Sequence, residues 1–350
     1  MNPQAKRPNP LIGFASTAIA LAVALGTTVV LLLLFGSDPA HALTSFFGGP
    51  FSSSLAWGNT LNQTSLLILT GLAASVAFGS GSFNLGGEGQ IYLGGLGALA
   101  AALVLPPGWG IVGLGLALCA GVLAGGVWGG LSGALKARWE ADELITTFLL
   151  SAAIIPVVDS LITSPLFASA GSYLITSRKI PHEFWLAGLL PPSNLHAGAL
   201  LVLPLVVVLG VLISSTPWGY RLRLLGRSRA FAHYTGISLA RYSLLPLGLS
   251  GGLHGLAGAL GVLGTQHALV QGFSSGWGWN GIAVALIART NPWAVVPAAL
   301  LFTFLDQAAR TVVLQGQFPF QLSALFQAAI LFFITAQLVP VARRKLRGKP

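Results

Sequence analysis

The chain has 350 residues, of which 54% are hydrophobic and only 7% are Asp, Glu, Lys or Arg. A soluble domain carries about 25% charged residues, so this composition excludes a soluble enzyme, a disordered chain and a nucleic-acid-binding protein. The mean hydropathy of +0.79 and the many apolar runs of about 20 residues, the length that crosses a bilayer, predict an integral membrane protein. Cys119 is the only cysteine, so no internal disulfide can form.

Glycine and proline are abundant, with 45 and 20 residues. In membrane helices, glycines allow close backbone approach and bends. We therefore expect an all-α, polytopic protein with glycine-rich broken helices, folded as one transmembrane domain over residues 1–350.

The apolar runs predict ten spans in chain order. They are 11–35, 61–80, 84–105, 110–134, 143–164, 196–214, 242–264, 273–288, 293–310 and 323–341. The first is longer than the apolar part of a signal peptide, so we expect it to be retained. The run at 273–288 is short and interrupted by glycine, and it is compatible with a full span or with a half-helix.

The basic residues indicate the orientation of the chain. With the N-terminus inside, 15 of the 18 Lys and Arg residues fall on the cytoplasmic side and 3 fall outside, as the positive-inside rule requires. Both termini are then cytoplasmic. The external segment 36–60 lacks periodicity, the long loop 165–195 is external, and the long basic loop 215–241 is internal.

Residues 83–90 read FNLGGEGQ and place Asn84, Glu88 and Gln90 in an otherwise apolar region. A carboxylate at membrane depth is costly unless it meets water or a partner, and irregular backbone is tolerated there only inside protein or along a cavity. A second polar break, QGFSSGWGWNGIAVAL at 271–286, contains Trp277, Trp279 and Asn280. Both breaks are candidate sites on physical grounds.

These breaks resemble segments of the membrane permease subunits of ABC importers of the simple-sugar and nucleoside group. That family carries Phe-Asn-Ile-Gly followed by Glu-Gly-Gln, matched at 83–90, and a Gly-Phe-Ser to Gly-Ile-Ala-Val-Ala-Leu segment with an Asn-Pro turn, matched at 272–292. Its Glu-(Val/Leu)-Ile-(Ser/Thr)-Thr helix start is matched at 143–147. The resemblance runs from about residue 60 to the C-terminus and is nearest to the longer nucleoside permease type. Asn280 replaces the usual aspartate, and Ser151 stands where asparagine is common.

The internal loop resembles the family's cytoplasmic coupling loop, whose short helix docks into the ATPase subunit. Residues 221–237 are expected to form a short basic amphipathic helix, which Gly236 can close as its first residue beyond the C-cap. The residues that we assign to ATPase coupling are Arg221, Arg223, Gly226, Arg227, Arg229 and Gly236. The alternative is an ordinary positively charged loop bound to lipid headgroups.

Each polar residue also has a structural interpretation. Asn84, Glu88 and Gln90 have two interpretations: they line the pathway, or they hold two helices together. Trp277 and Trp279 also have two: they stack on a ligand ring, or they anchor the chain at the membrane–water interface. Glu140, Asp142 and Glu143 are expected to cap a helix near Lys136 and Arg138, and Asp306 to pair with Arg310. Glycines 121, 125, 129 and 133 predict a packing ridge. We expect no metal site, cofactor or catalytic residue.

The resemblance implies a permease subunit that moves a nucleoside or a related small polar ligand across the cytoplasmic membrane of a prokaryote. No phosphate-binding Gly-x-x-x-x-Gly-Lys-Ser/Thr loop occurs, so a separate ATPase subunit must supply the energy. The other implied partners are a second, different permease chain and an extracytoplasmic substrate-binding lipoprotein. A simple sugar or riboflavin is the alternative ligand, and an ATP-independent secondary transporter is the alternative of a different class.

Overall fold

The computed structural model describes residues 26, 27, 29, 30, 33, 38–169 and 175–314. The chain divides into two units, residues 54–301 and residues 1–53 with 302–350, and each is described by itself. The predicted span 323–341 lies outside the described residues, as does the predicted span 11–35 apart from five isolated positions.

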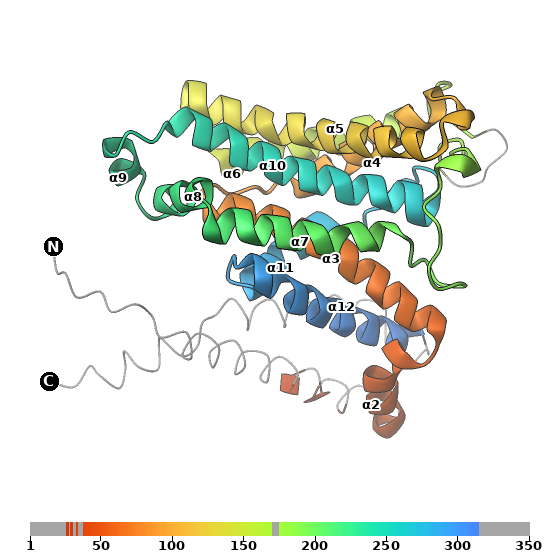
Figure 1. Cartoon of the computed structure of the whole chain (residues 1–350). Helices are drawn as coiled ribbons and strands as arrows, with labels where there is room; N and C mark the ends of the chain where they lie inside the picture. The colour runs from red at the N-terminus through yellow and green to blue at the C-terminus, as the bar shows by residue number, and fades with distance from the viewer. Residues whose placement is uncertain (1–25, 28, 31–32, 34–37, 170–174, 315–350) are drawn as a thin grey trace, which may run out of the picture. The chain divides into compact units, whose positions relative to one another are not determined.

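The larger unit consists of α-helices joined by short turns and one long irregular segment (Figure 1). The helices are α3 (Ser54–Gly79), α4 (Gly87–Val104), α5 (Gly110–Trp139), α6 (Glu143–Ile162), α7 (Gly198–Ser215), α8 (Pro217–Arg227), α9 (Arg229–Tyr234), α10 (Leu239–Leu260), α11 (Trp277–Ile287) and the start of α12 (Pro292–Leu314). Within the described residues there is no strand, and only isolated β-bridges occur. The prediction of an all-α polytopic protein is confirmed.

Six described helices are long and apolar enough to cross a membrane, namely α3, α5 with the turn before it, α6, α7, α10 with its extension, and α12. Several boundaries differ from the predicted spans, among them the following three. Helix α3 begins earlier, at Ser54, α4 begins later, at Gly87, and α10 continues as a π-helix over Gly261–Gln266. Helix α11 has 11 residues, about half the length of a full span, so the run at 273–288 forms a half-helix.

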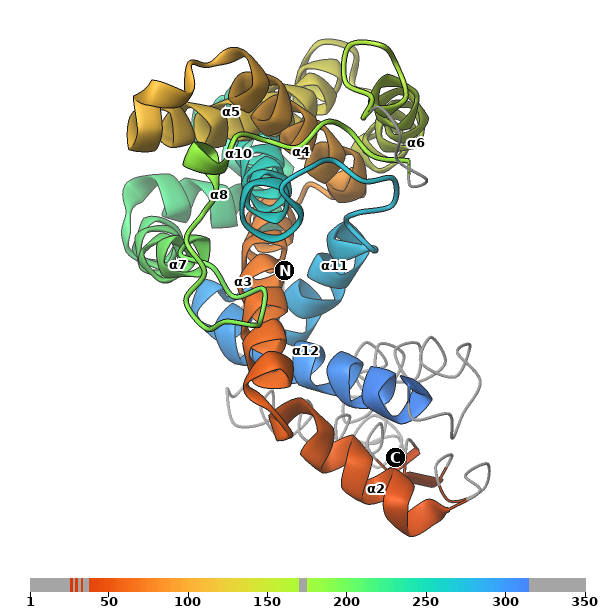
Figure 2. The same ribbon diagram turned by 90° about the vertical axis from the view of Figure 1, so that its right-hand side faces the viewer.

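Helix α10 lies between α5 and α3, and α11 lies against α3 on the other side (Figure 2). Glycines allow α5 and α10 to meet backbone to backbone. A Cβ atom at Gly125 would lie 2.4 Å from the carbonyl oxygen of Gly251, and one at Gly255 would lie 2.3 Å from that of Gly121. The predicted glycine ridge of α5 therefore packs against α10.

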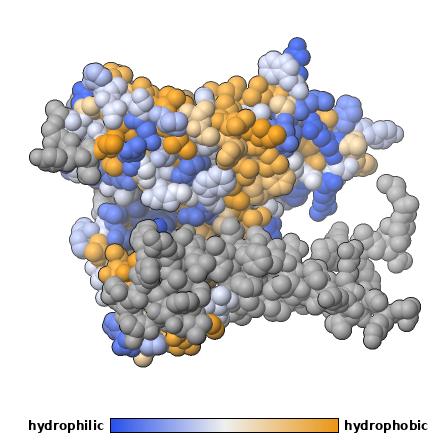
Figure 3. Space-filling model, turned by 180° about the vertical axis from the view of Figure 1, so that it is seen from behind, coloured by the Kyte–Doolittle hydropathy of each residue, from blue (hydrophilic) through white to orange (hydrophobic). Residues whose placement is uncertain are grey.

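The outward faces of α5 and α6 are apolar. In their most apolar stretches only 22% of the residues are buried, against 83% in α3 and 89% in α10. Figure 3 shows the apolar band on the side that carries α6 and a hydrophilic surface toward the end that carries α8 and α9. The apolar outward faces of α5 and α6 suit contact with lipid or with another membrane chain.

The segment between α6 and α7 covers the end of α10 opposite α8 and α9. It contains one short 3-10 helix, His182–Phe184, and its residue Ser177 donates a backbone hydrogen bond of 2.9 Å to the Leu269 carbonyl. The Trp185 ring stacks on the His267 ring with a centroid separation of 3.7 Å. The predicted external loop 165–195 is therefore anchored to the chain that follows α10.

The smaller unit contains α2 (Pro39–Gly48), the 3-10 turn Gly49–Phe51 and the later turns of α12. Asp38 caps α2 through a hydrogen bond from the His41 N–H. The aperiodic segment 36–60 thus contains a helix and the first turns of α3, because capping and proline at the first position can start a helix without an apolar pattern. The predicted Asp306–Arg310 ion pair forms at 2.9 Å.

Candidate functional site: a polar break in the bundle and a basic end

The chain between α3 and α4 does not continue as a helix. Residues 82–86 have no regular structure, and Ser82 and Asn84 are buried. The Asn84 Oδ1 atom accepts a hydrogen bond of 2.9 Å from the Gly86 N–H, a local bond with which Asn competes against helix formation. This bond explains why α4 begins at Gly87 rather than at the predicted residue 84.

Asn84 and Gln90 form a buried network that reaches α10. The Asn84 Nδ2 atom donates to the Gln90 Oε1 and Ser250 Oγ atoms, both at 2.9 Å. Gln90 donates back to Asn84 at 3.1 Å, and its Oε1 atom lies 3.0 Å from the Nδ1 atom of His254. Because at most 1% of Asn84, Gln90 or His254 is exposed, this network fixes the start of α4 within the protein.

Glu88 joins the start of α4 to the start of α11. Its carboxylate accepts hydrogen bonds from the Ser274 hydroxyl, from the Gly276 N–H at 3.1 Å and from the Gly278 N–H at 2.8 Å. The first N–H groups of a helix lack partners within it, and the N-terminal end carries a partial positive charge. One carboxylate therefore serves two helix N-termini, those of α4 and α11.

The two tryptophans of the second break have different surroundings. Trp277 is buried, and its ring packs over Gly261 of the π-helix. Trp279 is 48% exposed, and its ring centroid lies 6.4 Å from that of Phe148 on α6. Asn280 follows on α11 and is half-buried. Trp279 and Phe148 thus offer aromatic faces beside the Glu88 contact.

Sequence reasoning did not assign functional roles to the α6 side chains that complete this region. The Thr147 hydroxyl accepts a hydrogen bond of 3.0 Å from the Leu85 N–H, and the Ser151 hydroxyl accepts one of 2.8 Å from the Gly89 N–H. Glu143, Thr147 and Ser151 are four residues apart and share one helix face. This polar stripe on an apolar helix is the signal that could have revealed them.

The predicted basic helix is two helices. Thr216 caps α8 and Ser228 caps α9, and the extended backbone of Ser228 (φ −158°) separates them. The prediction of one helix over 221–237 is wrong because the Ser228 side chain bonds to the Phe231 N–H and starts a new helix there. Gly236, with φ +81°, follows the C-cap Thr235 as predicted.

The basic residues of this loop are placed differently from one another. Arg221, Arg227 and Arg229 are exposed, whereas Arg223 donates to the carbonyl groups of Ile213 and Ser214 in the last turn of α7. Burial of the apolar side that carries Leu222, Leu225 and Ala232 against Tyr242 holds the two short helices to α10. The exposed arginines are thus presented on a fixed scaffold.

Lys136, at the end of α5, belongs to the same end of the protein. Its ammonium lies 2.5 Å from Glu143 and donates to the Ser82 hydroxyl at 3.1 Å. Asp142 caps α6 by accepting from the Leu144 N–H at 2.8 Å. The predicted capping role is therefore confirmed for Asp142, and Glu143 pairs with Lys136 as expected.

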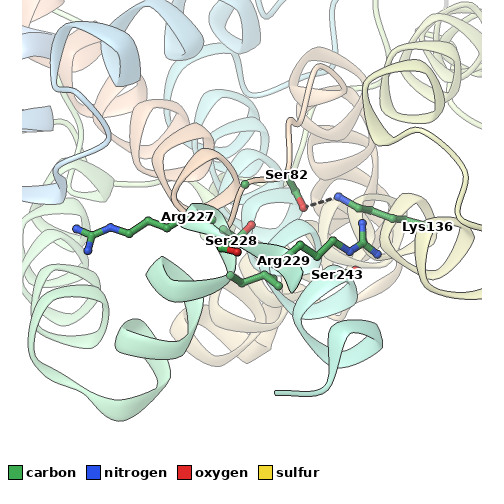
Figure 4. A pocket seen from close by; sticks show the side chains of 10 residues that line it. Ser82, Lys136, Arg227, Ser228, Arg229 and Ser243 are labelled. Atoms are coloured by element: carbon green, nitrogen blue, oxygen red, sulfur yellow. Dashed lines mark hydrogen bonds between the residues drawn. The ribbon is translucent and has the colours of Figure 1, made fainter. Parts of the chain in front are cut away.

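A cavity of about 200 Å³ lies between these elements (Figure 4). It is lined by Lys136 and Ser243, by residues 80–82 after α3, and by residues 225–229 where α8 meets α9. The loop predicted to couple to an ATPase therefore borders the turn that leads into the polar break.

Comparison with known proteins places this architecture in a family. Residues 57–335 match the family described as branched-chain amino acid transport system / permease component. That range contains both polar breaks and the basic loop.

Three relatives match along most of the chain. The "Probable riboflavin import permease protein RfuC" of Treponema pallidum is 33% identical over 91% of this chain and 84% of its own. The guanosine ABC transporter permease protein NupP of Bacillus subtilis is 30% identical over 91% of this chain and 92% of its own. The glucose ABC transporter permease protein TsgB13 of Haloferax volcanii is 28% identical over 93% and 88%. This chain belongs to the family of branched-chain amino acid transport system permease components.

Proposed function

We propose that this chain is the permease subunit of a binding-protein-dependent ABC importer that moves a nucleoside or a related ligand with a flat heterocyclic ring. The observation that carries the proposal is the exposed basic pair α8–α9, held against the turn that enters the polar break. The chain has no phosphate-binding loop of its own, so a separate ATPase subunit that docks on the exposed arginines of residues 221–229 supplies the energy.

The end that carries α8 and α9 faces the cytoplasm in this proposal. Helices α8 and α9, which carry the arginines of residues 221–229, lie at this one end (Figure 1), and Lys136 lines the same cavity as Arg227 and Arg229, as the positive-inside rule requires of a cytoplasmic face. Both termini then lie in the cytoplasm, and the opposite end, covered by the segment between α6 and α7, receives a substrate-binding lipoprotein. A second, different permease chain completes the pathway.

The ligand class follows from the polar break. Glu88 already occupies the N–H groups at the start of α11, so that helix end is not available to an anionic substrate. Trp279 and Phe148 supply partly exposed rings for stacking. Guanosine and riboflavin, which name two of the relatives, are uncharged and join a flat nitrogen-containing ring system to a hydroxylated five-carbon group, which is a ribose ring in guanosine and an open ribityl chain in riboflavin.

Riboflavin is the second candidate ligand, because the relative that carries its name is 33% identical to this chain. A simple sugar such as glucose has no flat ring for Trp279. Guanosine and riboflavin, which both contain a flat ring system, should therefore compete with each other for uptake, whereas glucose should inhibit the uptake of neither.

The test is uptake of labelled guanosine and of labelled riboflavin by cells with and without the gene, with the other ligand, unlabelled, and glucose as competitors. We expect deletion to remove ATP-dependent uptake and plasmid-borne expression to restore it. An ATPase subunit should copurify with the protein. Guanosine and riboflavin uptake that deletion leaves unchanged would refute the ligand class, and an ATPase that never copurifies would refute the importer assignment.

A further inference from the structure

The last turn of α8 approaches the turn after α3 closely, with backbone atoms of two glycines at the contact. A Cβ atom at Gly226 would lie 2.5 Å from the Gly79 carbonyl oxygen and 3.1 Å from the Gly81 nitrogen, and one at Gly81 would lie 2.9 Å from the Gly226 Cα atom. Gly81 also has φ +73°, a conformation that glycine adopts without strain. The two glycines permit a contact that side chains would prevent.

This contact is local. Beside it the two segments are separated by the cavity of about 200 Å³, which residues 80–82 line from one side and residues 225–229 from the other. Figure 4 shows Ser82 and Ser228 at this cavity, with the Arg227 side chain directed away from it. Lys136 is already paired with Glu143, so the cavity is better explained as the space beside a contact than as an anion site.

The turn on the far side of this contact leads directly into the polar break. Ser82 is held by Lys136 of α5, and Asn84 is held by Ser250 of α10. Four residues beyond Asn84, Glu88 accepts hydrogen bonds from two N–H groups at the start of α11. The chain from Gly81 to Glu88 is thus short and is hydrogen-bonded in turn to α5, α10 and α11, and such packed networks can carry a displacement from one site to another.

We propose that Gly226 and Gly81 form the junction through which movement of the docked α8–α9 pair reaches the polar break and α11. Both act here as positioning residues, because they contact each other's backbone and are proposed to act through the turn after α3. The inference rests on the proposed function and adds the place at which ATPase movement enters the pathway.

The central variant is Gly226→Ala, whose methyl group must displace the turn after α3 because the nearest atom is a backbone oxygen. The matched control is Gly79→Ala at the same junction, where the added Cβ would meet the Leu222 Cδ2 atom at 3.4 Å, an ordinary contact. We expect Gly226→Ala to lower ligand uptake about tenfold, within the usual range of coupling between sites. ATPase copurification and ATP hydrolysis should remain near those of the parent, as should all three readouts in the control.

A second measurement has its main readout in the protein with both glycines intact. Phe83 is 45% exposed and lies between the junction and Asn84, so Phe83→Cys in a Cys119→Ser background reports on this segment through its rate of reaction with a maleimide. With the glycines intact, we expect addition of ATP to the complex with the ATPase to change that rate. With Gly226→Ala, the rate should no longer respond to ATP.

The outcomes separate this inference from the proposed function. Normal uptake by Gly226→Ala, or a Phe83→Cys rate that ATP leaves unchanged while uptake proceeds, overturns the junction. Loss of ATPase copurification in Gly226→Ala also overturns it, because Gly226 would then belong to the docking surface. Absence of ATP-dependent uptake in the parent protein refutes the proposed function instead.

Discussion

The Glu88 carboxylate accepts a hydrogen bond of 2.8 Å from the Gly278 N–H, so a residue of the first turn of α4 caps the first turn of α11. A glutamine at position 88 would turn an NH₂ group toward one of these N–H donors, and the negative charge between two helix N-termini would be lost. We expect Glu88→Gln to lower stability by about 1–3 kcal/mol and to reduce uptake.

The measurement is the thermal unfolding midpoint in detergent together with the uptake rate. Glu183→Gln is the control, because Glu183 is an exposed acid on the segment between α6 and α7. An unchanged unfolding midpoint combined with a changed KM for uptake would instead make Glu88 a ligand-contacting residue.

The α5–α10 contact predicts a second effect. Gly125→Ala places a methyl group 2.4 Å from the Gly251 carbonyl oxygen, and because both partners are backbone, the helices must separate. We expect a loss of about 1–3 kcal/mol in stability. Gly115→Ala on the same helix, where nothing lies within 4 Å of the added Cβ, should leave the unfolding midpoint unchanged, and equal behaviour of the two variants would contradict the ridge.

The sequence was sufficient for the helices of the bundle but not for the contacts between them. Long apolar runs predict helices because lipid leaves backbone groups no other partner, and the same argument marked the polar breaks at Asn84 and Trp277. The partner of Glu88 could not be predicted, because Ser274 lies 186 residues away. The start of α4 at Gly87 and the break between α8 and α9 at Ser228 could not be predicted either. Each depends on one hydrogen bond between a side chain and the backbone, made by Asn84 and by Ser228, and such local bonds compete with helix formation.

Substitutions of Arg223 and Arg227 of α8 should produce different phenotypes. Arg223 donates to carbonyl groups at the end of α7, whereas Arg227 is exposed and directed away from the cavity (Figure 4). We expect Arg223→Gln to lower the unfolding midpoint, because it removes the guanidinium that bonds to the carbonyl groups before the turn between α7 and α8. Arg227→Glu should keep that midpoint and weaken ATPase copurification about tenfold, as loss of an interfacial charge contact does.

Copurification at several salt concentrations checks the assignment of Arg227. Because exposed charge contacts are screened, added salt should weaken ATPase binding in the parent and have less effect in Arg227→Glu. Lys179→Glu is a charge-matched control at an exposed position of the segment between α6 and α7, outside residues 215–241. Equal losses in both variants would point to a general effect of net charge rather than to a docking contact.

His196, which precedes α7, predicts acid sensitivity. Burial, and next the positive charge on His267, lower the pKa of His196 to about 4, and its Nδ1 atom accepts a hydrogen bond of 3.2 Å from the Gly198 N–H. Because the pKa is lower in the folded than in the unfolded chain, the contribution to stability is complete above pH about 6.5 and is lost as the pH falls toward about 4. The loss can reach about 3 kcal/mol.

The unfolding midpoint, measured between these pH values, should fall more steeply in the parent than in His196→Asn, whose amide oxygen can still accept from the Gly198 N–H. His41→Gln, a substitution at an exposed position, should follow the parent. Identical slopes in parent and His196→Asn would assign the acid sensitivity to another group.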